Sequence, residues 1–528
     1  MQLHGNQLIG SAISAEGDAT FIGVDPASGT ALEPQIHEAT ANEVARAMEL
    51  AESAFHAFRG TPRETRARFL DAIADEVINL GDQLLELVAT ETGHPPGRCL
   101  GERARALNQA RLFAKLIREG SWVDARVDTP QPERKPLPKP DVRSMLQPIG
   151  PVIVFGASNF PLAISVVGTD TVSALACGCP VVVKAHPAHP GTCELLGRAV
   201  LAAAETCQLP EGVFSMVHGL STEVGMALVR HPAARAVAFT GSLRGGRALF
   251  DAAVARPAPI PFYGEMGSVN PIFVLPGALG ANAESVAKGF IQSLTLGVGQ
   301  FCTNPGLIFG LAGDPLEAFF EAAAGIATAA APATMLHAGI HSAFLEGVER
   351  IRAMDGVDLA AVSRRRADPA KAEAACHLFR TDAASLERNP QLFEEVFGPV
   401  STLVRCERAE EMLSFAGKLE GSLTASLFGT PADLAAHREL IDILSDKAGR
   451  LIFNGFPTGI EVCAAMHHGG PYPATTHSHF TSIGTRSILR FVRPVCYQGW
   501  PQQALPEELR DGNPLGISRQ EDGALVSG

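Results

Sequence analysis

Apolar residues recur at helical spacing in the N-terminal part of this chain. Val44 and Met48 follow that spacing, and Thr40 precedes them with Glu43 three residues later. A threonine and a glutamate so placed can cap a helix reciprocally, which predicts a helix that begins after Thr40. Similar patterns predict three further helices over residues 62–80, 82–92 and 101–119. The segment before Trp122 is therefore predicted to be mostly helical.

The pattern changes after Pro151, where short apolar runs alternate with amphipathic stretches. The runs are typical of strands buried on both faces and cover residues 152–155, 181–183, 213–217 and 236–239. Helical patterns between and after them cover 162–177, 192–207, 222–230 and 243–254. This alternation predicts a parallel sheet with helices on both faces, and it resumes from about residue 270 to 429. Ligands of such sheets bind at the carboxyl ends of the strands.

A third pattern separates these two parts. Residues 123–128 and 142–146 alternate apolar and polar, and the joint between them is rich in proline. Two strands with a stiff connection predict a projecting β-ribbon, whose unpaired edges need a partner. We interpret it as an oligomerisation arm, with an unpartnered surface hairpin as the alternative. Residues 487–494 are strand-like and can join it, whereas the polar tail from Pro506 is predicted to be loose.

Composition narrows the class of protein. A chain of 528 residues with 46% hydrophobic and 19% charged residues predicts two or three globular domains. A net charge of -13 without a basic stripe argues against nucleic acid or an anionic membrane as a partner. We expect no signal peptide and no membrane span, and ten scattered cysteines indicate reduced thiols of a cytoplasmic protein. Cys177 and Cys179 complete no zinc motif, so no metal site is predicted.

The loop over residues 296–305 carries the first candidate for chemistry. It joins a predicted helix, residues 283–296, to a strand-like run, 307–309, and it places Cys302 among glycines and small polar residues. A small molecule can reach a thiol in such a loop, and a thiolate attacks a carbonyl carbon readily. The alternative is a small buried hydrophobe, which is the usual role of a free cysteine.

Asn159 and Glu265 can assist such a nucleophile. Asn159 follows a strand end and can donate an N–H to an oxyanion, or it can simply cap a turn. Glu265 lies in a nearly uncharged, strand-like segment. Burial there predicts a raised pKa and a base that acts on water, whereas the alternative is a paired structural carboxylate.

Two strand ends suit a dinucleotide. Lys184 ends one strand, two residues before His186, and can bind ribose hydroxyls or phosphate. Residues 239–246 form a strand-to-helix turn in which Gly241, Ser242 and Gly246 leave backbone N–H groups for a pyrophosphate. This turn is not the Gly-x-Gly-x-x-Gly fingerprint, and an ordinary glycine-containing turn is the alternative.

Together these segments resemble the aldehyde dehydrogenase superfamily over nearly the whole chain. Six motifs stand in the family's order, namely residues 159–161, 183–184, 239–242, 265–267, 299–302 and 395–399. The resemblance implies an α/β fold with a Rossmann-type cofactor domain, an α/β catalytic domain and a β-ribbon oligomerisation arm. It places the cofactor domain at 1–121 and 147–265, the catalytic domain at 266–480, the arm at 122–146 and 481–500, and a polar tail at 501–528.

The resemblance also implies the chemical roles. Cys302 attacks an aldehyde, and Asn159 with the Cys302 backbone N–H holds the oxyanion. Hydride transfer to NAD(P) leaves a thioester, and Glu265 activates the water that hydrolyses it. Phe160 and Phe301 are expected to flank the substrate.

The implied cofactor residues come from several segments. Lys184, with His186 beside it, is expected near the adenosine ribose, and the 239–246 turn is expected along the pyrophosphate. Glu395 is expected to hold the nicotinamide ribose, with Phe397 close to the ring.

The chain departs from the common family pattern at two positions. Ser268 stands where a second glycine is usual, and Pro187 stands where many NAD-using members carry a glutamate for the ribose diol. Without that carboxylate, a 2′-phosphate meets less repulsion, and His186 or His189 can approach it. We therefore expect NADP as the cofactor, with NAD possible.

A closer resemblance is to bacterial NADP-linked α-ketoglutaric semialdehyde (2,5-dioxovalerate) dehydrogenases, on residues 101–103, 183–187, 453–459 and 468–475. That substrate carries a carboxylate, so a cation such as Arg103, Arg105 or Arg111 is expected at its far end. The alternatives are a fatty or aromatic aldehyde and a catalytically lapsed oligomeric binding protein. The expected assembly is a homodimer or homotetramer.

Overall fold

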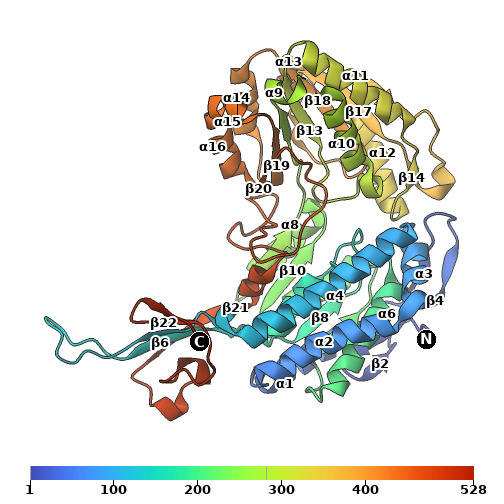
Figure 1. The fold of residues 1–528 in the computed structure, drawn as a ribbon. Coiled ribbons are helices and arrows are strands. Elements are labelled where there is room, and N and C mark those ends of the chain that lie inside the picture. The colour runs from blue at the N-terminus through green and yellow to red at the C-terminus, as the bar shows by residue number, and fades with distance from the viewer. Residues whose placement is uncertain (1, 281) are drawn as a thin grey trace.

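The computed structural model describes residues 2–280 and 282–528. Residues 1 and 281 fall inside the predicted domain ranges and lie outside the described residues. Two seven-stranded sheets, each covered by helices, form the body, and a five-stranded sheet forms a projecting arm (Figure 1). The α/β class predicted from the alternating pattern is confirmed.

Five neighbouring strands of the first sheet, from one edge inwards, are parallel, and two antiparallel strands complete the other edge. Its order is β11 (Phe262–Glu265), β10 (Ala236–Thr240), β7 (Val152–Phe155), β8 (Val181–Lys184), β9 (Phe214–Val217), β1 (Gln7–Ile9) and β2 (Ala12–Ser14). Thr240 pairs with Glu265 where β10 and β11 end, which brings two candidate segments to one edge.

Helices cover both faces of this sheet because successive residues of each buried strand point to opposite sides. Val152 and Val154 pack against α2 (Arg63–Asn79), α4 (Pro96–Glu119), α5 (Thr169–Cys177) and α6 (Pro190–Thr206). Ile153 packs on the other face, which is covered by α1 (Ala41–Arg59), α7 (Thr222–Arg230) and α8 (Leu243–Val254). α3 (Gly81–Thr92) adds to the first layer. The predicted Thr40–Glu43 capping box opens α1.

The helix predicted over residues 162–177 is shorter than expected. α5 begins only at Thr169, and residues before it form a tight loop that returns on itself. A Cβ at Gly156 would lie 2.6 Å from the Ile164 carbonyl oxygen, so only glycine permits this approach. The loop carries Asn159 and Phe160, and apolar side chains that cover the loop produced the misleading helical pattern.

The second sheet is parallel except for one edge strand. Its order is β15 (Val357–Val362), β17 (His377–Asp382), β18 (Val400–Cys406), β13 (Leu307–Leu311), β12 (Ile272–Val274), β19 (Ser422–Phe428) and β20 (Ala448–Phe453). One face carries α9 (Pro276–Leu279), α10 (Ala283–Thr295) and α11 (Asp314–Ala329). The other carries α12 (Ala338–Arg352), α13 (Ala383–Arg388), α14 (Ala409–Lys418) and α16 (Arg438–Lys447), with α15 (Pro431–Ala436) alongside.

Two small sheets and several 3-10 turns complete these units. The pairs are β3 (Thr20–Val24) with β4 (Ala31–His37) and β14 (Ala333–Thr334) with β16 (Glu373–Ala374). The turns are η1 (Ser121–Val123), η2 (Leu296–Gly299), η3 (Pro369–Lys371), η4 (Pro390–Phe393), η5 (Thr485–Phe491), η6 (Gln502–Ala504) and η7 (Glu507–Leu509). None of the helices in the described part of the chain is both long and apolar enough to cross a membrane.

The arm sheet gathers segments that lie far apart in the sequence. Its order is β21 (Val492–Gln498), β6 (Val142–Pro148), β5 (Arg126–Asp128), β22 (Arg519–Glu521) and β23 (Ala524–Val526). The proline-rich joint between β5 and β6 extends beyond the other strands (Figure 1). The strand predicted at 487–494 begins later, because residues 485–491 form η5 and pack on the first unit.

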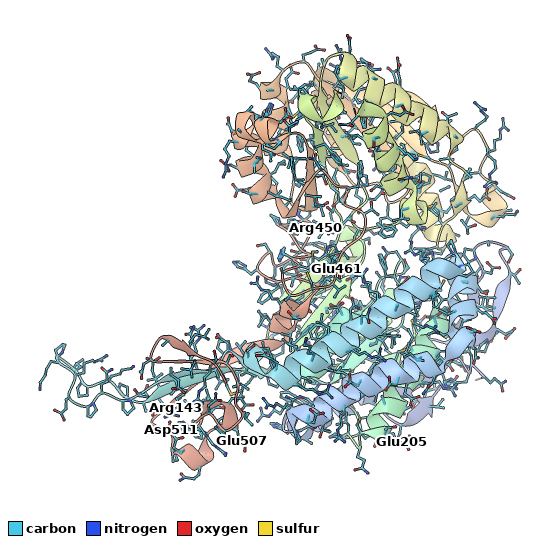
Figure 2. The ribbon with its side chains drawn as sticks, in the orientation of Figure 1. Arg143, Glu205, Arg450, Glu461, Glu507 and Asp511 are labelled. Atoms are coloured by element: carbon cyan, nitrogen blue, oxygen red, sulfur yellow. The ribbon has the colours of Figure 1, made fainter. Side chains whose placement is uncertain are left out.

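The prediction of a loose tail from Pro506 is wrong. Leu509 and Ile517 are buried against Val123 and Met145 of the arm. Arg143 donates to the Leu509 carbonyl oxygen and pairs with Asp511 at 2.8 Å (Figure 2). The tail looked polar because only a few of its residues are apolar, yet those few supply much of the arm's small core.

Leu509→Ala is expected to loosen the arm. Replacing a fully buried leucine with alanine lowers the free energy of unfolding by about 2–5 kcal/mol. The arm is held by a small apolar cluster, so we expect this loss to affect the arm. Hydrogen exchange should accelerate in β5 and β6 and leave the two large sheets unchanged. Leu525→Ala is the matched control, since Leu525 lies in the same tail with 74% of its surface exposed. Equal exchange in both variants would contradict the docking of the tail.

Candidate active site

The loop that carries Cys302 is held by close backbone contacts. Gly297, Val298 and Gly299 all have positive φ between α10 and Cys302, a conformation that valine rarely adopts. A Cβ at Gly299 would lie 2.3 Å from the carbonyl carbon of Gly398. Asn270 donates through Nδ2 to the Cys302 carbonyl oxygen at 2.9 Å. The Cys302 thiol therefore lies on a turn that close contacts hold in place between α10 and β13.

Cys302 lies beside a carboxylate and an imidazole. His468 Nε2 is 3.3 Å from the Cys302 Sγ and 3.0 Å from Glu265 Oε1. Ser482 donates its hydroxyl to Glu265 Oε2 at 2.5 Å. Glu265 and His468 are both 4% exposed, measured on their side chains. The ligand-type atoms of Cys302, Glu265 and His468 all lie within 4.8 Å of one another, so three reactive groups meet at one point.

The raised pKa predicted for Glu265 is wrong. Burial acts to raise it, but the neighbouring His468 and the hydrogen bonds from His468, Ser482 and Cys302 outweigh burial and lower the pKa to about 2. Burial, with the charge of Glu265, raises the pKa of the Cys302 thiol well above its ordinary value. The site thus combines an ionised Glu265 carboxylate with a protonated Cys302 thiol near neutral pH.

Asn159 faces the same thiol from the first unit. Its Nδ2 donates to the Gln300 carbonyl oxygen at 2.9 Å, two residues before Cys302. An amide nitrogen has two N–H groups, so one remains for an oxyanion near the sulfur. Arg98 donates to the Asn159 carbonyl oxygen at 2.7 Å and lies over the Phe301 ring, which fixes the loop behind Asn159.

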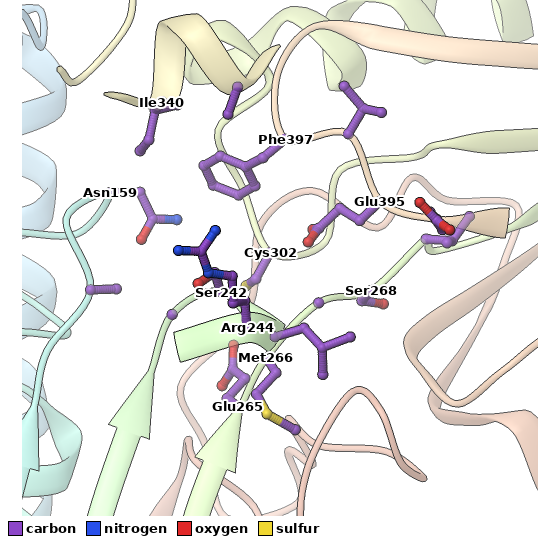
Figure 3. A pocket seen from close by; sticks show the side chains of 18 of the residues that line it. Asn159, Ser242, Arg244, Glu265, Met266, Ser268, Cys302, Ile340, Glu395 and Phe397 are labelled. Atoms are coloured by element: carbon purple, nitrogen blue, oxygen red, sulfur yellow. The ribbon is translucent and has the colours of Figure 1, made fainter. Parts of the chain in front are cut away.

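A channel of about 750 Å³ leads to Cys302. Residues from both large units line it, among them Ser242 and Arg244 of the first and Ile340, Glu395 and Phe397 of the second (Figure 3). In the close view Cys302 lies between Asn159 and Glu395, with Glu265 below it (Figure 3). The channel is large enough for a dinucleotide, since small-molecule sites span about 300–1,000 Å³.

The predicted phosphate turn opens at the N-terminus of α8. Ser242 caps this helix by accepting from the Gly245 N–H, and Gly241 and Ser242 line the channel. Backbone N–H groups of the first turn suit a pyrophosphate. Gly246 has a packing role instead. A Cβ at Gly246 would lie 2.7 Å from the Met266 Sδ, so the glycine allows α8 to pack on the segment after Glu265.

The two basic residues at the end of β8 differ in placement. His186 lines the channel, and burial lowers its pKa well below the ordinary value, so the ring is neutral. Lys184 is outside the channel lining and donates to the Gly219 carbonyl oxygen. Burial lowers its pKa to about 8, with the Glu38 carboxylate acting in the opposite direction.

Glu395 and Phe397 come from the turn before β18. Burial raises the pKa of Glu395 to about 8, and a Cβ at Gly267 would lie 3.1 Å from its Oε2. Glu395 is exposed to the channel that it lines, and its carboxyl suits the hydroxyl pair of a ribose, which donates hydrogen bonds. Together with the free N–H groups at the start of α8, these residues fit NAD(P), whose nicotinamide accepts a hydride when bound.

Of the residues predicted to bind the substrate, Phe160 lines the channel and Arg103 does not. Phe160 lines the channel and meets the Phe301 ring edge-on at 5.3 Å. Arg103 does not: it donates to the Gly81 carbonyl oxygen at 3.1 Å and is not in the channel lining. Arg111 pairs with Asp75 on the surface. Arg105 is also outside the channel lining, but it lies over the ring of Phe160, which lines the channel, and is near enough to Cys302 and Glu265 for their charges to affect its pKa.

Sequence analysis missed the partners that complete the site. His468 stands in the motif over residues 468–475, but nothing in the local pattern marks it as a partner of Cys302, which lies 166 residues earlier. No local pattern marks Ser482 or Arg450 either. Glu38 is not marked because it comes near Lys184 only in the folded chain. Such contacts arise from folding, not from local spacing.

Comparisons with known proteins identify relatives of the whole chain. The model of the "Aldehyde dehydrogenase family" matches residues 13–471. "Alpha-ketoglutaric semialdehyde dehydrogenase 2" of Azospirillum brasilense is 48% identical, over 99% of each chain. "Alpha-ketoglutaric semialdehyde dehydrogenase" of Acinetobacter baylyi is 46% identical, over 93% of this chain and 92% of the relative.

Solved structures show the same fold. Aldehyde Dehydrogenase C from Pseudomonas syringae, solved as a mutant with NAD+ and octanal, superposes with a TM-score of 0.79 at 21% identity, over 95% of this chain and 98% of that one. A 1-pyrroline-5-carboxylate dehydrogenase gives a TM-score of 0.79 at 22% identity, over 94% and 92%.

Alkylation should report the charge around Cys302. Because the thiolate is the reactive form and its pKa is raised, iodoacetamide labelling should rise about tenfold per pH unit from pH 7 to 9. Glu265→Gln removes the anion that raises this pKa, so labelling at pH 8 should become faster. Mass spectrometry of the Cys302 peptide measures the rate, with the exposed Cys496 as internal reference. A rate independent of pH over this range would contradict the raised pKa.

Proposed function

Because the chain belongs to the aldehyde dehydrogenase family, we propose that it oxidises α-ketoglutaric semialdehyde (2,5-dioxopentanoate) to 2-oxoglutarate with NAD(P)+. The observation that carries the reaction is the position of Cys302 in the wall of a dinucleotide-sized channel that Asn159 and Glu265 also line. The two relatives at 48% and 46% identity, both named for this aldehyde, support the substrate.

The residues of the site divide the work. The Cys302 sulfur attacks the aldehyde carbon, and the free Asn159 N–H with the Cys302 backbone N–H holds the resulting oxyanion. NAD(P), when bound, would supply the hydride acceptor that the substrate carbon needs to become a thioester on Cys302. Glu265 takes a proton from the water that hydrolyses this thioester, and the carboxylate product departs.

Two guanidinium groups support a substrate with a carboxylate at its far end. Arg105 and Arg450 are partly buried, and each has a buried Nε without a hydrogen-bond partner among the described residues. The pKa of each is lowered mainly by burial, while the charge of Cys302 acts to raise it, so both lie near the thiol. Arg450 lies between the two large units (Figure 2). A charged group bound there satisfies donors that burial otherwise penalises.

We propose NADP as the preferred cofactor. Pro187 stands where a ribose-binding glutamate is common in the resembling family, which favours a 2′-phosphate. Glu38 near Lys184 acts against this preference, so NAD use is expected as well. We also propose a cytoplasmic homodimer or homotetramer, which ten unpaired cysteines and the projecting arm support.

A panel of aldehydes assayed with both cofactors tests the function. We expect the highest kcat/KM for α-ketoglutaric semialdehyde, and a higher value with NADP than with NAD. Cys302→Ala should abolish reduced-nicotinamide formation and leave NADP binding intact, because the sulfur alone is removed. Cys496→Ala, on the arm, is the control and should retain full activity. Failure of the wild-type protein on every aldehyde would favour a lapsed binding protein.

Arg105→Met tests the substrate. Loss of a charged hydrogen bond costs about 1.5–3 kcal/mol, so kcat/KM for the semialdehyde should fall about 10- to 100-fold. Activity on pentanal, which lacks the carboxylate, should change far less. Arg103→Met is the matched control on the same helix, because Arg103 donates to the Gly81 carbonyl oxygen and is not in the channel lining. Equal losses on both aldehydes would favour the fatty-aldehyde alternative.

A further inference from the structure

We propose that a cavity at the base of the arm, which we call the basal cavity, binds a small organic dicarboxylate through Arg59, Arg63 and Arg66. It measures about 220 Å³ and is separate from the channel that leads to Cys302, since no residue lines both. The inference goes beyond the proposed aldehyde oxidation and does not depend on it. The observations are three guanidinium groups without ion-pair partners and the apolar walls around them.

Three parts of the chain that are far apart in the sequence form the basal cavity. The junction of α1 and α2 lines it from the first unit, and residues 145–148 of β6 line it from the arm. The tail contributes Pro506, Glu508 and Ile517. These parts meet where the arm leaves the first unit (Figure 1). A ligand in the cavity therefore contacts the body, the arm and the tail together.

The walls of the basal cavity carry positive charge that the chain does not neutralise. Arg66 is 9% exposed, and its Nε is buried without a hydrogen-bond partner among the described residues, as is Nη1 of Arg63. Neither of them, nor Arg59, forms an ion pair within residues 2–280 and 282–528, whereas Arg118 on the neighbouring helix α4 pairs with two carboxylates. Three guanidinium groups against the single carboxylate of Glu508 leave the lining a formal charge of +2.

Backbone contacts hold two of these guanidinium groups in place. Nη1 of Arg66 donates to the carbonyl oxygens of Arg59 and Thr61, at 3.2 and 2.7 Å, where α1 ends and α2 begins. Nη2 of Arg63 donates to the Leu515 carbonyl oxygen of the tail at 3.1 Å. Each guanidinium keeps further N–H groups, because arginine has five donors. The donors are thus positioned before a ligand binds, which lowers the entropic cost of binding.

Arg66 is the group that gains most from a bound anion. Burial lowers its pKa, and the Glu508 carboxylate acts in the opposite direction without coming close enough to form an ion pair. A buried cation without a paired anion is costly, and a guanidinium binds a carboxylate through two parallel hydrogen bonds. A carboxylate in the basal cavity would satisfy the Arg66 N–H group that the protein leaves without an acceptor.

The apolar walls favour an organic anion over an inorganic one. They include Ile117, Trp122, Val123, Met145, Pro506 and Ile517. Sites for drug-sized molecules span about 300–1,000 Å³, so a cavity of about 220 Å³ suits a ligand with only a few carbon atoms. Two carboxylates match the formal charge of the lining, and a short chain of methylene groups between them can contact the apolar walls. Glutarate has this chemistry.

Such a ligand would fasten the arm and the tail to the first unit. A molecule that binds only where all three parts meet stabilises the state in which they are docked. Added glutarate should therefore slow hydrogen exchange in residues 506–517 and in β6.

Calorimetric titration of the full chain with glutarate tests the site. Arg63→Met removes one guanidinium and keeps the helix junction that Arg66 holds, so the Kd should rise about 10- to 100-fold. Glu508→Gln removes the one carboxylate of the lining, so the Kd should fall about 2- to 5-fold. Arg68→Met is the matched control, since Arg68 is exposed on the same helix and is not in the lining. Arg105→Met should also leave glutarate binding unchanged, because Arg105 lies near Cys302.

Three results would overturn the proposal. The first is an absence of glutarate binding by the wild-type protein at millimolar concentration, or binding that neither Arg63→Met nor Glu508→Gln changes. The second is inorganic phosphate binding as tightly as glutarate, since phosphate has no carbon chain for the apolar walls. The third is a smaller assembly of Arg63→Met in light scattering while the wild-type protein binds no glutarate, because the cavity would then be a contact between subunits. None of these measurements uses aldehyde turnover, so the site can be refuted while the proposed function stands.

Discussion

The contact between Glu265 and His468 is the interaction on which the rest of the site depends. A buried carboxylate is costly unless it is paired and fully hydrogen-bonded, and here an imidazole and the Ser482 hydroxyl meet its two oxygens. The pair spans 203 residues of sequence and ties the last strand of the first sheet to a segment beyond the second sheet. The sulfur of Cys302 therefore meets polar groups whose positions are fixed before any substrate arrives.

The cofactor channel also lies between the two large units, and residues of both line it. Parallel strands deliver their loops to one edge, so Ser242 arrives from the first sheet and Glu395 from a turn of the second. Neither unit alone supplies both the N-terminus of α8 and the carboxyl of Glu395. A dinucleotide in this channel contacts both units, and the chemistry at Cys302 depends on how they are held together.

Sequence patterns predicted the elements well and the contacts poorly. The bounds of α7 and α8 agree with the pattern, because their apolar faces and flanking turns are local features. The pattern failed at residues 162–168, where burial in a loop imitates a helix. It gave the family's core residues through ordered motifs, but not His468, and it reversed the pKa of Glu265, since a pKa depends on neighbours that only the folded chain brings together. The tail was misjudged because Leu509 and Ile517 are few among polar residues.

The arm imposes an order on how the chain is completed during synthesis. β6 is made early, whereas its neighbour β21 and the strands β22 and β23 are made only after the second large unit. Throughout translation of the second large unit, β6 keeps an open hydrogen-bonding edge, and such edges pair readily with other chains. A chain that has not yet reached β21 is thus more prone to aggregate, and the pairing of β21 with β6 removes this hazard.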